Sequence, residues 1–359
     1  MKVWNFNPGP AKLPEPVLLQ IQQELLDFQG TGISILETSH RSVAFDKILF
    51  GAEENIRQLL KFTSDECQII FMQGGANMQF FMAPLNLAVP GKPFVYHDTG
   101  YWSQKAIAAA KEIGEVWRIK TFENGRFDLD PEYETMQKYL KAAYEHITSN
   151  ETIDGKRWRY LFDGRFTPPI VVDMSSDFLS RYFRVQQCGL VYAGAQKNLG
   201  IAGVTVVIIR NDMLKRNGLH PDKFHCYRTH LGSRYNTPPV VAIYVLKLMT
   251  DWILAQGLDN IQDANYQKAK RLYDYIDGSG LYENNVHEDV RSVMNVVFLL
   301  KEGYEELVND LLEHFEDHGL IGLKGHRSVG GFRASLYNAM PIDGVRALVE
   351  AMKEFERTH

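Results

Sequence analysis

Apolar runs and amphipathic stretches alternate along the first two thirds of the chain. The apolar runs are short, as expected of strands buried on both faces of a sheet. They predict strands at 68–72, 93–97, 115–120, 170–173 and 204–209. A further strand is predicted in the segment that precedes Lys197. Apolar residues at helical spacing predict helices at 16–28, 45–60, from Met78 onward, and at 104–113, 131–144 and 240–254. This alternation predicts an α/β fold.

The pattern changes near residue 257, where the regular alternation ends. There we predict a long helix at 258–276, a strand at 293–300, a helix at 302–318, a glycine-rich strand at 321–335 and a helix at 342–357. We therefore predict a large domain of residues 16–257 and a smaller α/β domain of residues 258–359, which residues 1–15 join.

The composition is that of a soluble globular protein, and 359 residues suffice for two domains that share a large core. A formal net charge of -5 gives no basic surface for nucleic acid and no attraction to a membrane. The three cysteines, Cys67, Cys188 and Cys226, lack metal-ligand spacing and favour a reducing compartment. Without a signal-peptide core or a membrane-length apolar run, we expect a cytoplasmic protein.

A lysine lies in a turn of small residues between two predicted buried strands. Lys197 follows Gly194-Ala195-Gln196 and precedes the apolar run that begins at Val204. Burial would lower the pKa of its amine and favour the neutral, nucleophilic form that Schiff-base chemistry with an aldehyde cofactor requires. On spacing alone, a lysine that extends from a strand end into solvent is an equally good interpretation.

An aspartate ends the apolar strand upstream of this lysine. Asp173 would face the crevice at the edge of an α/β sheet, where ligands bind, although it is also a common turn former. Held near a pyridine nitrogen, it would keep that nitrogen protonated and the ring electron-accepting. The order and spacing of Asp173 and Lys197 are those expected of an enzyme that uses pyridoxal 5'-phosphate (PLP).

Three loops carry residues suited to such a cofactor. The glycine turn from Gln73 to Asn77 joins a strand to a helix and would offer free backbone N–H groups to an anion, although many such turns only reverse the chain. Trp102 would stack on a flat ring or fill the rim of the core. Thr152 would bond a ring oxygen or stabilise its own turn.

Two groups of cationic residues are suited to an anionic substrate. His40 and Arg41 are adjacent in one loop, and the glycine-rich segment 324–333 carries a histidine and two arginines: His326, Arg327 and Arg333. Arginine binds carboxylate and phosphate through two parallel hydrogen bonds, whereas solvated surface charges are the alternative interpretation. Together the two groups suggest a substrate with anionic groups at both ends.

Over nearly the whole chain, these segments resemble one family, the phosphoserine aminotransferases, which are class V aminotransferases of PLP fold type I. The matching segments, in the family's order, are Asn5–Pro10, Ser39–Arg41, Gln73–Gly75, Gly100–Ser103, Asn150–Gly155, Tyr192–Asn198, Tyr235–Pro239, Lys324–Arg327 and Arg333–Pro341. The resemblance implies PLP as cofactor, a large domain with a mixed, mostly parallel sheet, and a smaller C-terminal α/β domain. It also implies ping-pong transamination between L-glutamate and 3-phosphohydroxypyruvate, giving O-phospho-L-serine and 2-oxoglutarate in L-serine biosynthesis.

The resemblance also implies roles for the cofactor-binding residues. Lys197 would form the internal aldimine and carry the proton between Cα and C4′. Asp173 would pair with the pyridinium nitrogen, Trp102 would stack on the ring, and Thr152 would bond the phenolic oxygen. The cofactor phosphate would be held near four residues of one subunit and two of its partner in a homodimer with shared active sites. These are Gly75, Ala76, Asn77 and Gln196, with Asn236 and Thr237 contributed by the partner.

For the substrate, the resemblance implies that Arg333 binds the α-carboxylate. The distal anion would be bound by His326 and Arg327, and by His40 and Arg41 across the dimer. One pocket would then accept both the glutamate carboxylate and the phosphate of the keto acid.

The sequence departs from the family's pattern in two places. Asn77 replaces an arginine found in some members, and the segment 221–234 is shorter and more basic than in relatives. Two alternatives remain. The first is another PLP enzyme of the same fold, either an aminotransferase with a different acceptor or a desulfurase or lyase. A desulfurase would need a mobile nucleophilic cysteine, for which Cys226 is the loop candidate. A PLP-fold regulator would need a nucleic-acid-binding domain, for which neither length nor charge leaves room.

Overall fold

The computed structural model describes residues 2–120, 122–123, 126–127, 141–158, 168–219 and 222–359. The Asn124-Gly125 turn lies outside these residues, and so does most of the helix predicted at 131–144. Tyr144 itself begins a strand, β7 (Tyr144–Thr148), so the predicted end of that helix is wrong.

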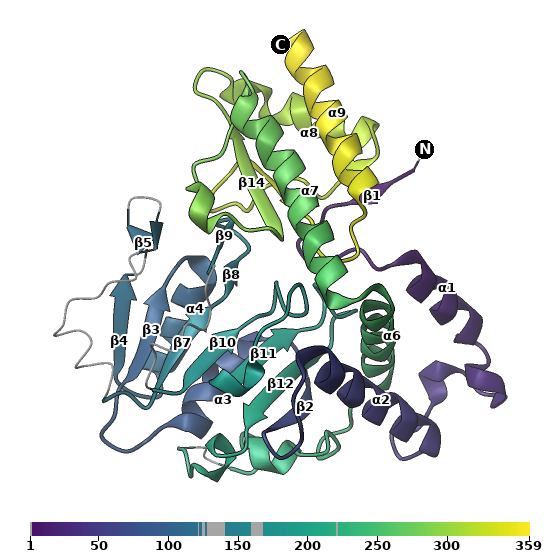
Figure 1. Cartoon of the computed structure of the whole chain (residues 1–359), viewed down its shortest axis with the longest axis vertical. Coiled ribbons are helices and arrows are strands. Elements are labelled where there is room, and N and C mark those ends of the chain that lie inside the picture. Colours follow the sequence, from purple (N-terminus) through teal and green to yellow (C-terminus); the bar gives the residue numbers. More distant parts are fainter. Residues whose placement is uncertain (1, 121, 124–125, 128–140, 159–167, 220–221) are drawn as a thin grey trace.

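A seven-stranded sheet forms the centre of the larger part of the molecule (Figure 1). Its strands, in spatial order, are β2 (Cys67–Gln73), β12 (Val204–Arg210), β11 (Cys188–Gly194), β10 (Ile170–Asp173), β7, β3 (Phe94–Asp98) and β4 (Val116–Lys120). Only β12 runs antiparallel to its neighbours, and the other strand pairs are parallel. The prediction of an α/β fold with a mixed, mostly parallel sheet is confirmed.

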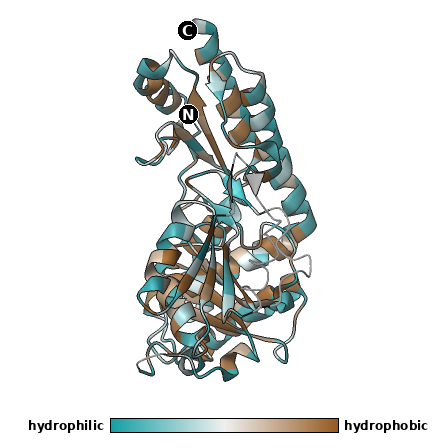
Figure 2. Ribbon diagram, turned by 90° about the vertical axis from the view of Figure 1, so that its left-hand side faces the viewer, coloured by the Kyte–Doolittle hydropathy of each residue, from teal (hydrophilic) through white to brown (hydrophobic). Residues whose placement is uncertain are grey.

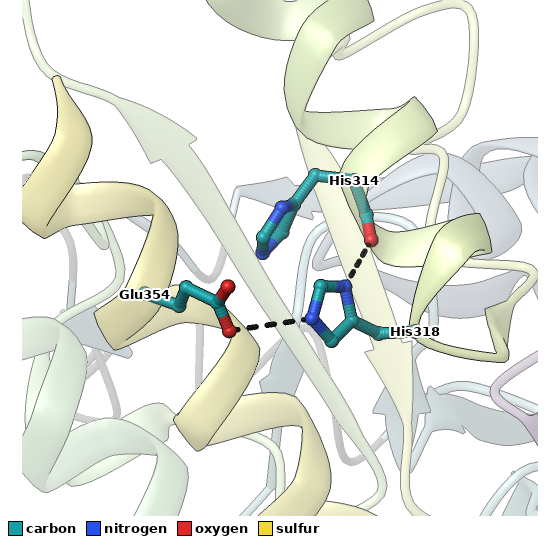
Figure 3. A group of neighbouring side chains, drawn as sticks. All are labelled: His314, His318 and Glu354. Atoms are coloured by element: carbon teal, nitrogen blue, oxygen red, sulfur yellow. Dashed lines mark hydrogen bonds and ion pairs between the residues drawn. The ribbon is translucent and has the colours of Figure 1, made fainter.

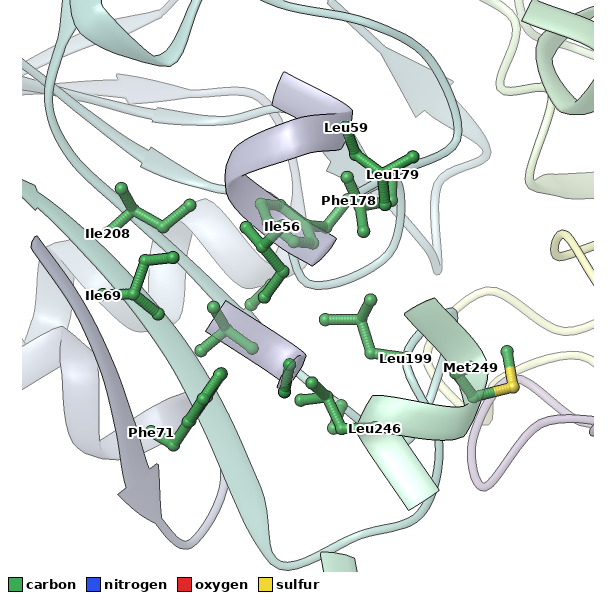
Figure 4. Packing of buried hydrophobic residues seen from close by; sticks show 14 of the residues in the cluster. Ile56, Leu59, Ile69, Phe71, Phe178, Leu179, Leu199, Ile208, Leu246 and Met249 are labelled. Carbon is green, nitrogen blue, oxygen red and sulfur yellow. The ribbon is translucent and has the colours of Figure 1, made fainter. Parts of the chain in front are cut away.

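Helices cover both faces of this sheet. Helices α2 (Val43–Leu60) and α6 (Val240–Gln256) contribute to the apolar cluster on one face, and α3 (Asn77–Leu87) and α4 (Tyr101–Lys111) contribute to the cluster on the other. Ile69 and Phe71 of β2 face the first cluster, whereas Ile70 and Met72 face the second, as the alternation of a strand requires (Figure 4). Burial on both faces explains why the strands are continuous apolar runs.

A second, smaller group of elements has its own core. It contains α7 (Leu258–Gly278), α8 (Val308–Asp317), α9 (Ile342–Thr358) and the sheet β13 (Tyr282–Glu283), β14 (Asn295–Leu300) and β16 (Phe332–Ser335). Helix α7 reaches both cores, since Ile261 belongs to that of the large sheet and Leu272 to that of the smaller group. In Figure 2 hydrophobic residues concentrate on the strands, and the long helices carry both polar and apolar residues. The domain boundaries given above stay a prediction.

The N-terminal segment joins this smaller group. Strand β1 (Trp4–Asn5) pairs in parallel with β15 (Leu320–Ile321), and Trp4 and Phe6 are buried in the smaller core. The chain then crosses to the large sheet, where Pro8 and Gly9 line its edge.

Three further predicted elements in the first and last parts of the chain also have wrong boundaries. The helix at 16–28 is α1 (Glu15–Glu24), because Leu25 and Leu26 are 38% and 83% exposed and anchor no further turn. The strand at 321–335 divides into β15 and β16, because Gly330 and Gly331 adopt positive φ angles of 76° and 59° in the turn between them. The helix at 302–318 begins only at Val308, after a 3-10 turn.

The remaining elements are short. They are the pairs β5 (Phe122–Glu123) with β6 (Arg126–Phe127) and β8 (Asn150–Glu151) with β9 (Lys156–Arg157), and the 3-10 helices η1 (Phe28–Gly30), η2 (Ile35–Glu37), η3 (Val185–Gln187), η4 (Met213–Lys215), η5 (Tyr227–His230), η6 (Glu288–Val290) and η7 (Glu305–Leu307). Among the described residues, no single helix has the length and apolar character to cross a bilayer; α6 and α7, bent by 88°, meet that criterion only as a pair.

Candidate active site

A cavity of about 600 Å³ lies at the carboxyl edge of the large sheet. Strands β2, β3, β7, β10 and β11 all end at this edge, because they run parallel to one another. Ligands in open α/β sheets bind at such an edge. Ten residues singled out from the sequence line the cavity: Gly75, Ala76, Asn77, Trp102, Thr152, Asp173, Gln196, Lys197, His326 and Arg333.

Lys197 lies in the turn between β11 and β12, as predicted, and its side chain reaches the cavity. Its Nζ is 5.6 Å from the centroid of the Trp102 ring. Burial lowers the pKa of Lys197, and Arg333 lowers it further, while Asp173 and Glu151 act in the opposite direction. The net shift favours a neutral amine, which is the nucleophilic form.

Asp173 ends β10 and is only 6% exposed. Its Oδ1 accepts hydrogen bonds from the backbone N–H (2.9 Å) and the hydroxyl (2.6 Å) of Ser175, which fix the carboxylate. Within the described part of the chain, Oδ2 has no hydrogen-bond partner, and Asp173 lines the cavity. Burial raises the pKa of Asp173 despite the hydrogen bonds from Ser175 and the charge of Lys197. A protonated ring nitrogen that faces this carboxylate would therefore stabilise the charged form of Asp173.

Trp102 lies in the first turn of α4, which begins at Tyr101 rather than at the predicted Gln104. Its indole Nε1 donates a 2.8 Å hydrogen bond to Thr152 Oγ1. That hydrogen bond fixes the orientation of the indole ring at the cavity.

Glu151 was not among the residues that the sequence suggested for the site. It is buried, and its carboxylate accepts hydrogen bonds from the backbone N–H groups of Trp102 and Ser103, both 2.9 Å long. The neighbouring Asp154 accepts from Tyr101 N at 3.1 Å. Burial, and secondly the charge of Asp154, raise the pKa of Glu151 to about 7. The N-terminus of α4 is thus occupied by the protein's own carboxylates.

The N-terminus of α3 has the opposite character. Ala76 precedes the helix and makes no side-chain cap, and in the described structure the backbone N–H groups of Gly75, Ala76 and Asn77 have no hydrogen-bond acceptor. Three adjacent free N–H groups at a helix N-terminus bind an anion such as phosphate. The glycine turn predicted this site, and Gln196 lines the cavity together with it.

Arg333 enters the cavity from β16, in the smaller group of elements. It is 8% exposed, and its Nη1 donates a 3.1 Å hydrogen bond to the carbonyl oxygen of Thr152. Its Nε is buried without a hydrogen-bond partner among the described residues. Burial lowers the pKa of Arg333. A buried guanidinium with an unused donor is a binding site for a carboxylate.

His326 also lines the cavity, in the turn between β15 and β16. Its Nδ1 accepts from Ser328 N (3.3 Å) and lies 2.6 Å from Ser328 Oγ. The ring centroid is 5.3 Å from that of Tyr101. With Nδ1 engaged as an acceptor, Nε2 carries the proton and can donate to an anion.

Five of the residues singled out from the sequence are not among those that line the cavity of this protomer. They are His40, Arg41, Asn236, Thr237 and Arg327. Arg327 follows His326 on an exposed turn, and Thr237 is exposed near the start of α6. Asn236 Nδ2 donates to Gln73 Oε1, directly before the glycine turn.

Several lining residues were given no role from the sequence. Pro8 and Gly9 come from the N-terminal crossing, and Ser175 and Ser176 follow Asp173. Ser176 Oγ donates to the carbonyl oxygen of Asn150 at 2.9 Å, which ties the Asp173 loop to the hairpin of Glu151. The sequence places two serines next to Asp173, but nothing local in it indicates that Ser176 bonds to Asn150.

Comparisons with known proteins agree with this geometry. A sequence model of the family described as aminotransferase class-V matches residues 3–348. The chain is 46% identical to phosphoserine aminotransferase of Geobacillus kaustophilus, over 99% of both proteins. It is 47% identical to that of Neisseria gonorrhoeae, over 99% of this chain and 98% of the relative.

Solved structures give the same result. A structure that reports radiation damage of the Schiff base in phosphoserine aminotransferase superposes with a TM-score of 0.93, at 43% identity and 100% coverage of both chains. The PLP-bound phosphoserine aminotransferase of Trichomonas vaginalis superposes with a TM-score of 0.89, at 36% identity, over 98% of this chain and 100% of that one.

Proposed function

Because this chain belongs to the class-V aminotransferase family, we propose that it transfers an amino group between L-glutamate and 3-phosphohydroxypyruvate. The products are O-phospho-L-serine and 2-oxoglutarate, a step in the biosynthesis of L-serine. The observation that carries the proposal is the meeting of an amine of lowered pKa, Lys197, and the carboxylate of Asp173 in one cavity.

The residues of the cavity fit pyridoxal phosphate as the cofactor. Asp173 Oδ2 is free to accept from a ring nitrogen, and the free N–H groups from Gly75 to Asn77 suit a phosphate. Trp102 offers a ring face, and Thr152, which already accepts from Trp102, offers its hydroxyl to a ring oxygen. When bound, the cofactor supplies an aldehyde and a ring that accepts electrons.

Lys197 acts as the general acid and base. Its neutral Nζ takes the proton from Cα of the amino-acid substrate, and Asp177, Glu151 and Asp173 stabilise the ammonium that results. Glu151 holds the first turn of α4, so that Trp102 keeps its position during the proton transfer.

Two anion sites select the substrate. Arg333 binds the α-carboxylate through the donors that the protein leaves unused. His326 and Arg327 bind the distal anion, which is the side-chain carboxylate of glutamate or the phosphate of the keto acid. One site for both anions lets the same pocket serve both half-reactions.

The remaining four residues complete the site from the partner subunit of a homodimer. His40 and Arg41 would add to the distal anion site, and Asn236 and Thr237 to the phosphate site. An ion pair between Arg234 and Asp46 brings the segments of these residues onto one surface. The same segments of the chain carry exposed large apolar residues, as is typical of a subunit interface: Leu36, Val43, Phe50 and Tyr235. The cysteines are buried and unpaired, which supports a reducing, cytoplasmic location.

A desulfurase is the weaker candidate. All three cysteines are buried, and burial raises the pKa of the Cys67 thiol to about 11 and that of Cys188 as well. The loop cysteine, Cys226, is 6% exposed. A desulfurase needs an accessible, reactive thiolate, and these thiols lack that character.

Replacing Lys197 tests the mechanism. Lys197→Ala should abolish transamination and the visible absorption of the bound cofactor, because Lys197 is the one lysine among the described residues that line the cavity. Lys268→Met is the matched control, since Lys268 is also buried with a lowered pKa, about 7, but donates to Leu336 and Tyr337 carbonyl oxygens away from the cavity. Full activity in Lys197→Ala would exclude the proposed role.

Half-reactions test the substrates. L-Glutamate and O-phospho-L-serine should each convert the bound cofactor far faster than L-alanine does. The absorption spectrum of the cofactor measures the rate of conversion. Arg333→Gln should slow all three amino acids, and Arg327→Gln only those with a distal anion, each by about 10- to 100-fold. Unchanged rates with both anionic substrates in Arg327→Gln would exclude the distal site as assigned.

A further inference from the structure

Three potential metal ligands meet between α8 and α9, in the smaller group of elements (Figure 3). His314 lies on α8, His318 directly follows its last residue, and Glu354 lies on α9. Each offers one ligand atom, and these three atoms all lie within 4.8 Å of one another. None of the three residues lines the active-site cavity.

The sequence spacing explains the first half of this arrangement. Residues four apart on a helix lie on one face, and the two imidazole rings lie side by side with their centroids 4.2 Å apart and their planes tilted by 40°. Because His318 is at the C-terminus of α8, a cation bound there would also be stabilised by the negative end of the helix dipole.

The hydrogen bonds of His318 fix its tautomer. Its Nδ1 lies 2.7 Å from the carbonyl oxygen of His314, so Nδ1 must carry the proton and donate it. Nε2 then faces Glu354 Oε2 at 3.3 Å. An imidazole lone pair and a carboxylate oxygen that face each other in this way provide two donor atoms for one metal ion. A histidine whose other N–H donates to a backbone carbonyl is the usual form of a metal ligand.

His314 completes the set. Its Nε2 lies 3.0 Å from the carbonyl oxygen of Ala351. Binding of a metal through Nδ1 would keep this hydrogen bond, whereas binding through Nε2 would replace it. Either way, the third ligand comes from the same helix as His318, and Glu354 comes from the facing one.

We propose that His314, His318 and Glu354 bind a divalent transition-metal ion of the Zn²⁺ class and so join α8 to α9. Imidazole and carboxylate ligands favour Zn²⁺, Co²⁺ or Ni²⁺ over Mg²⁺ and Ca²⁺, which prefer oxygen ligands. Three protein ligands leave the fourth tetrahedral position to water. The side chains of His318 and Glu354 are 38% and 52% exposed, so an ion enters directly from solvent.

Metal titration of the tag-free holoenzyme tests this site. Zn²⁺ binding is followed by calorimetry and Co²⁺ binding by its visible absorption, with the thermal unfolding midpoint measured at each metal concentration. We expect one ion per chain and a midpoint that rises with Zn²⁺ but not with Mg²⁺. His318→Ala and Glu354→Gln should each weaken binding by at least about 10-fold and remove the rise in midpoint.

His287→Ala is the matched control, because His287 also faces a carboxylate, Asp289 at 3.4 Å, but belongs to no cluster of three such ligands within the part of the chain that the structure describes. It should bind Zn²⁺ as the unchanged protein does, and transamination should be unaffected in all three variants. The proposal is overturned if the unchanged protein shows no saturable Zn²⁺ binding. It is equally overturned if His318→Ala and Glu354→Gln bind as tightly as His287→Ala.

Discussion

Two helices begin at the same edge of the large sheet, and their N-termini differ in what satisfies their N–H groups. At α4, Glu151 and Asp154 accept from Tyr101, Trp102 and Ser103. At α3, the N–H groups from Gly75 to Asn77 have no acceptor in the described structure. Both termini carry the same partial positive charge. The carboxylates at α4 therefore fix Trp102, whereas the N-terminus of α3 stays open, where the proposed function places the cofactor phosphate.

The glycines at the two termini should respond very differently to substitution. A Cβ at Gly100 would lie 2.8 Å from the carboxyl carbon of Asp154 and 2.9 Å from that of Glu151, whereas a Cβ at Gly75 would meet nothing within 4 Å. Gly100→Ala should therefore cost about 3–4 kcal/mol of unfolding free energy, since it overpacks the site and breaks the cap. Gly75→Ala should cost less than about 0.5 kcal/mol.

Urea unfolding of the two variants without cofactor measures this difference. Equal losses of stability would mean that the carboxylates at α4 are free to move, and the contrast between a closed and an open terminus would not hold.

The second prediction introduces a carboxylate at the open terminus. Asn77→Asp places a negative charge in the first turn of α3, where it should weaken cofactor binding by about 100-fold, or ~2.7 kcal/mol, through repulsion of the phosphate. Without cofactor, the same change should stabilise the protein by about 0.3–1 kcal/mol, because a carboxylate favours a helix N-terminus. The opposite signs distinguish a phosphate site from a turn that only reverses the chain. Equilibrium binding and unfolding of the same preparation check both.

The open terminus could be predicted from sequence and the closed one could not. A strand, two glycines and a helix are neighbours in the chain, and local backbone geometry creates the free N–H groups. The acceptor of Trp102 N and Ser103 N is Glu151, 49 and 48 residues away. Nothing local in the sequence links them, so we expected α4 to begin at Gln104, three residues late.

In the fold as well, features set by neighbouring residues could be predicted and features set by distant residues could not. Buried strands were found because their apolar runs are local. Asp173 and Lys197 were found because Asp173 ends one such strand and Lys197 lies in the turn after another. The end of α1 was missed because Leu25 and Leu26 match the helical pattern while facing solvent. Whether an apolar side chain finds a partner depends on distant residues.

The third prediction concerns the charge of the closed terminus. Because Glu151 has a pKa of about 7 in the folded protein and 4.5 as its ordinary value, the folded state holds this proton more tightly. Folding stability should therefore fall as pH rises from about 4.5 to 7. Each unit of pKa shift corresponds to about 1.36 kcal/mol, so the loss should be roughly 2 kcal/mol or more.

Glu151→Gln should remove this contribution, and the difference between the two stability profiles isolates it from other titrating groups. Asp154→Asn should narrow the pH range over which folding stability falls, because it removes the charge that is the second cause of the raised pKa of Glu151. Parallel profiles for the unchanged protein and Glu151→Gln would mean that the carboxylate is ionised throughout, held by its N–H donors.

The smallest effect is expected from strengthening the open terminus. Asn77→Arg introduces a cation at this position, and the Asn77 side chain is exposed at the cavity. A guanidinium beside the three N–H groups should tighten cofactor binding by about tenfold, or ~1.4 kcal/mol. It should also lower the stability of the cofactor-free protein by a few tenths of a kcal/mol, because a cation opposes the helix dipole. Asn77→Gln separates side-chain length from charge: tighter binding in that variant as well would assign the gain to contact rather than to charge. If Asn77→Arg weakens binding instead, the phosphate does not lie at this terminus, and its N–H groups are satisfied by water.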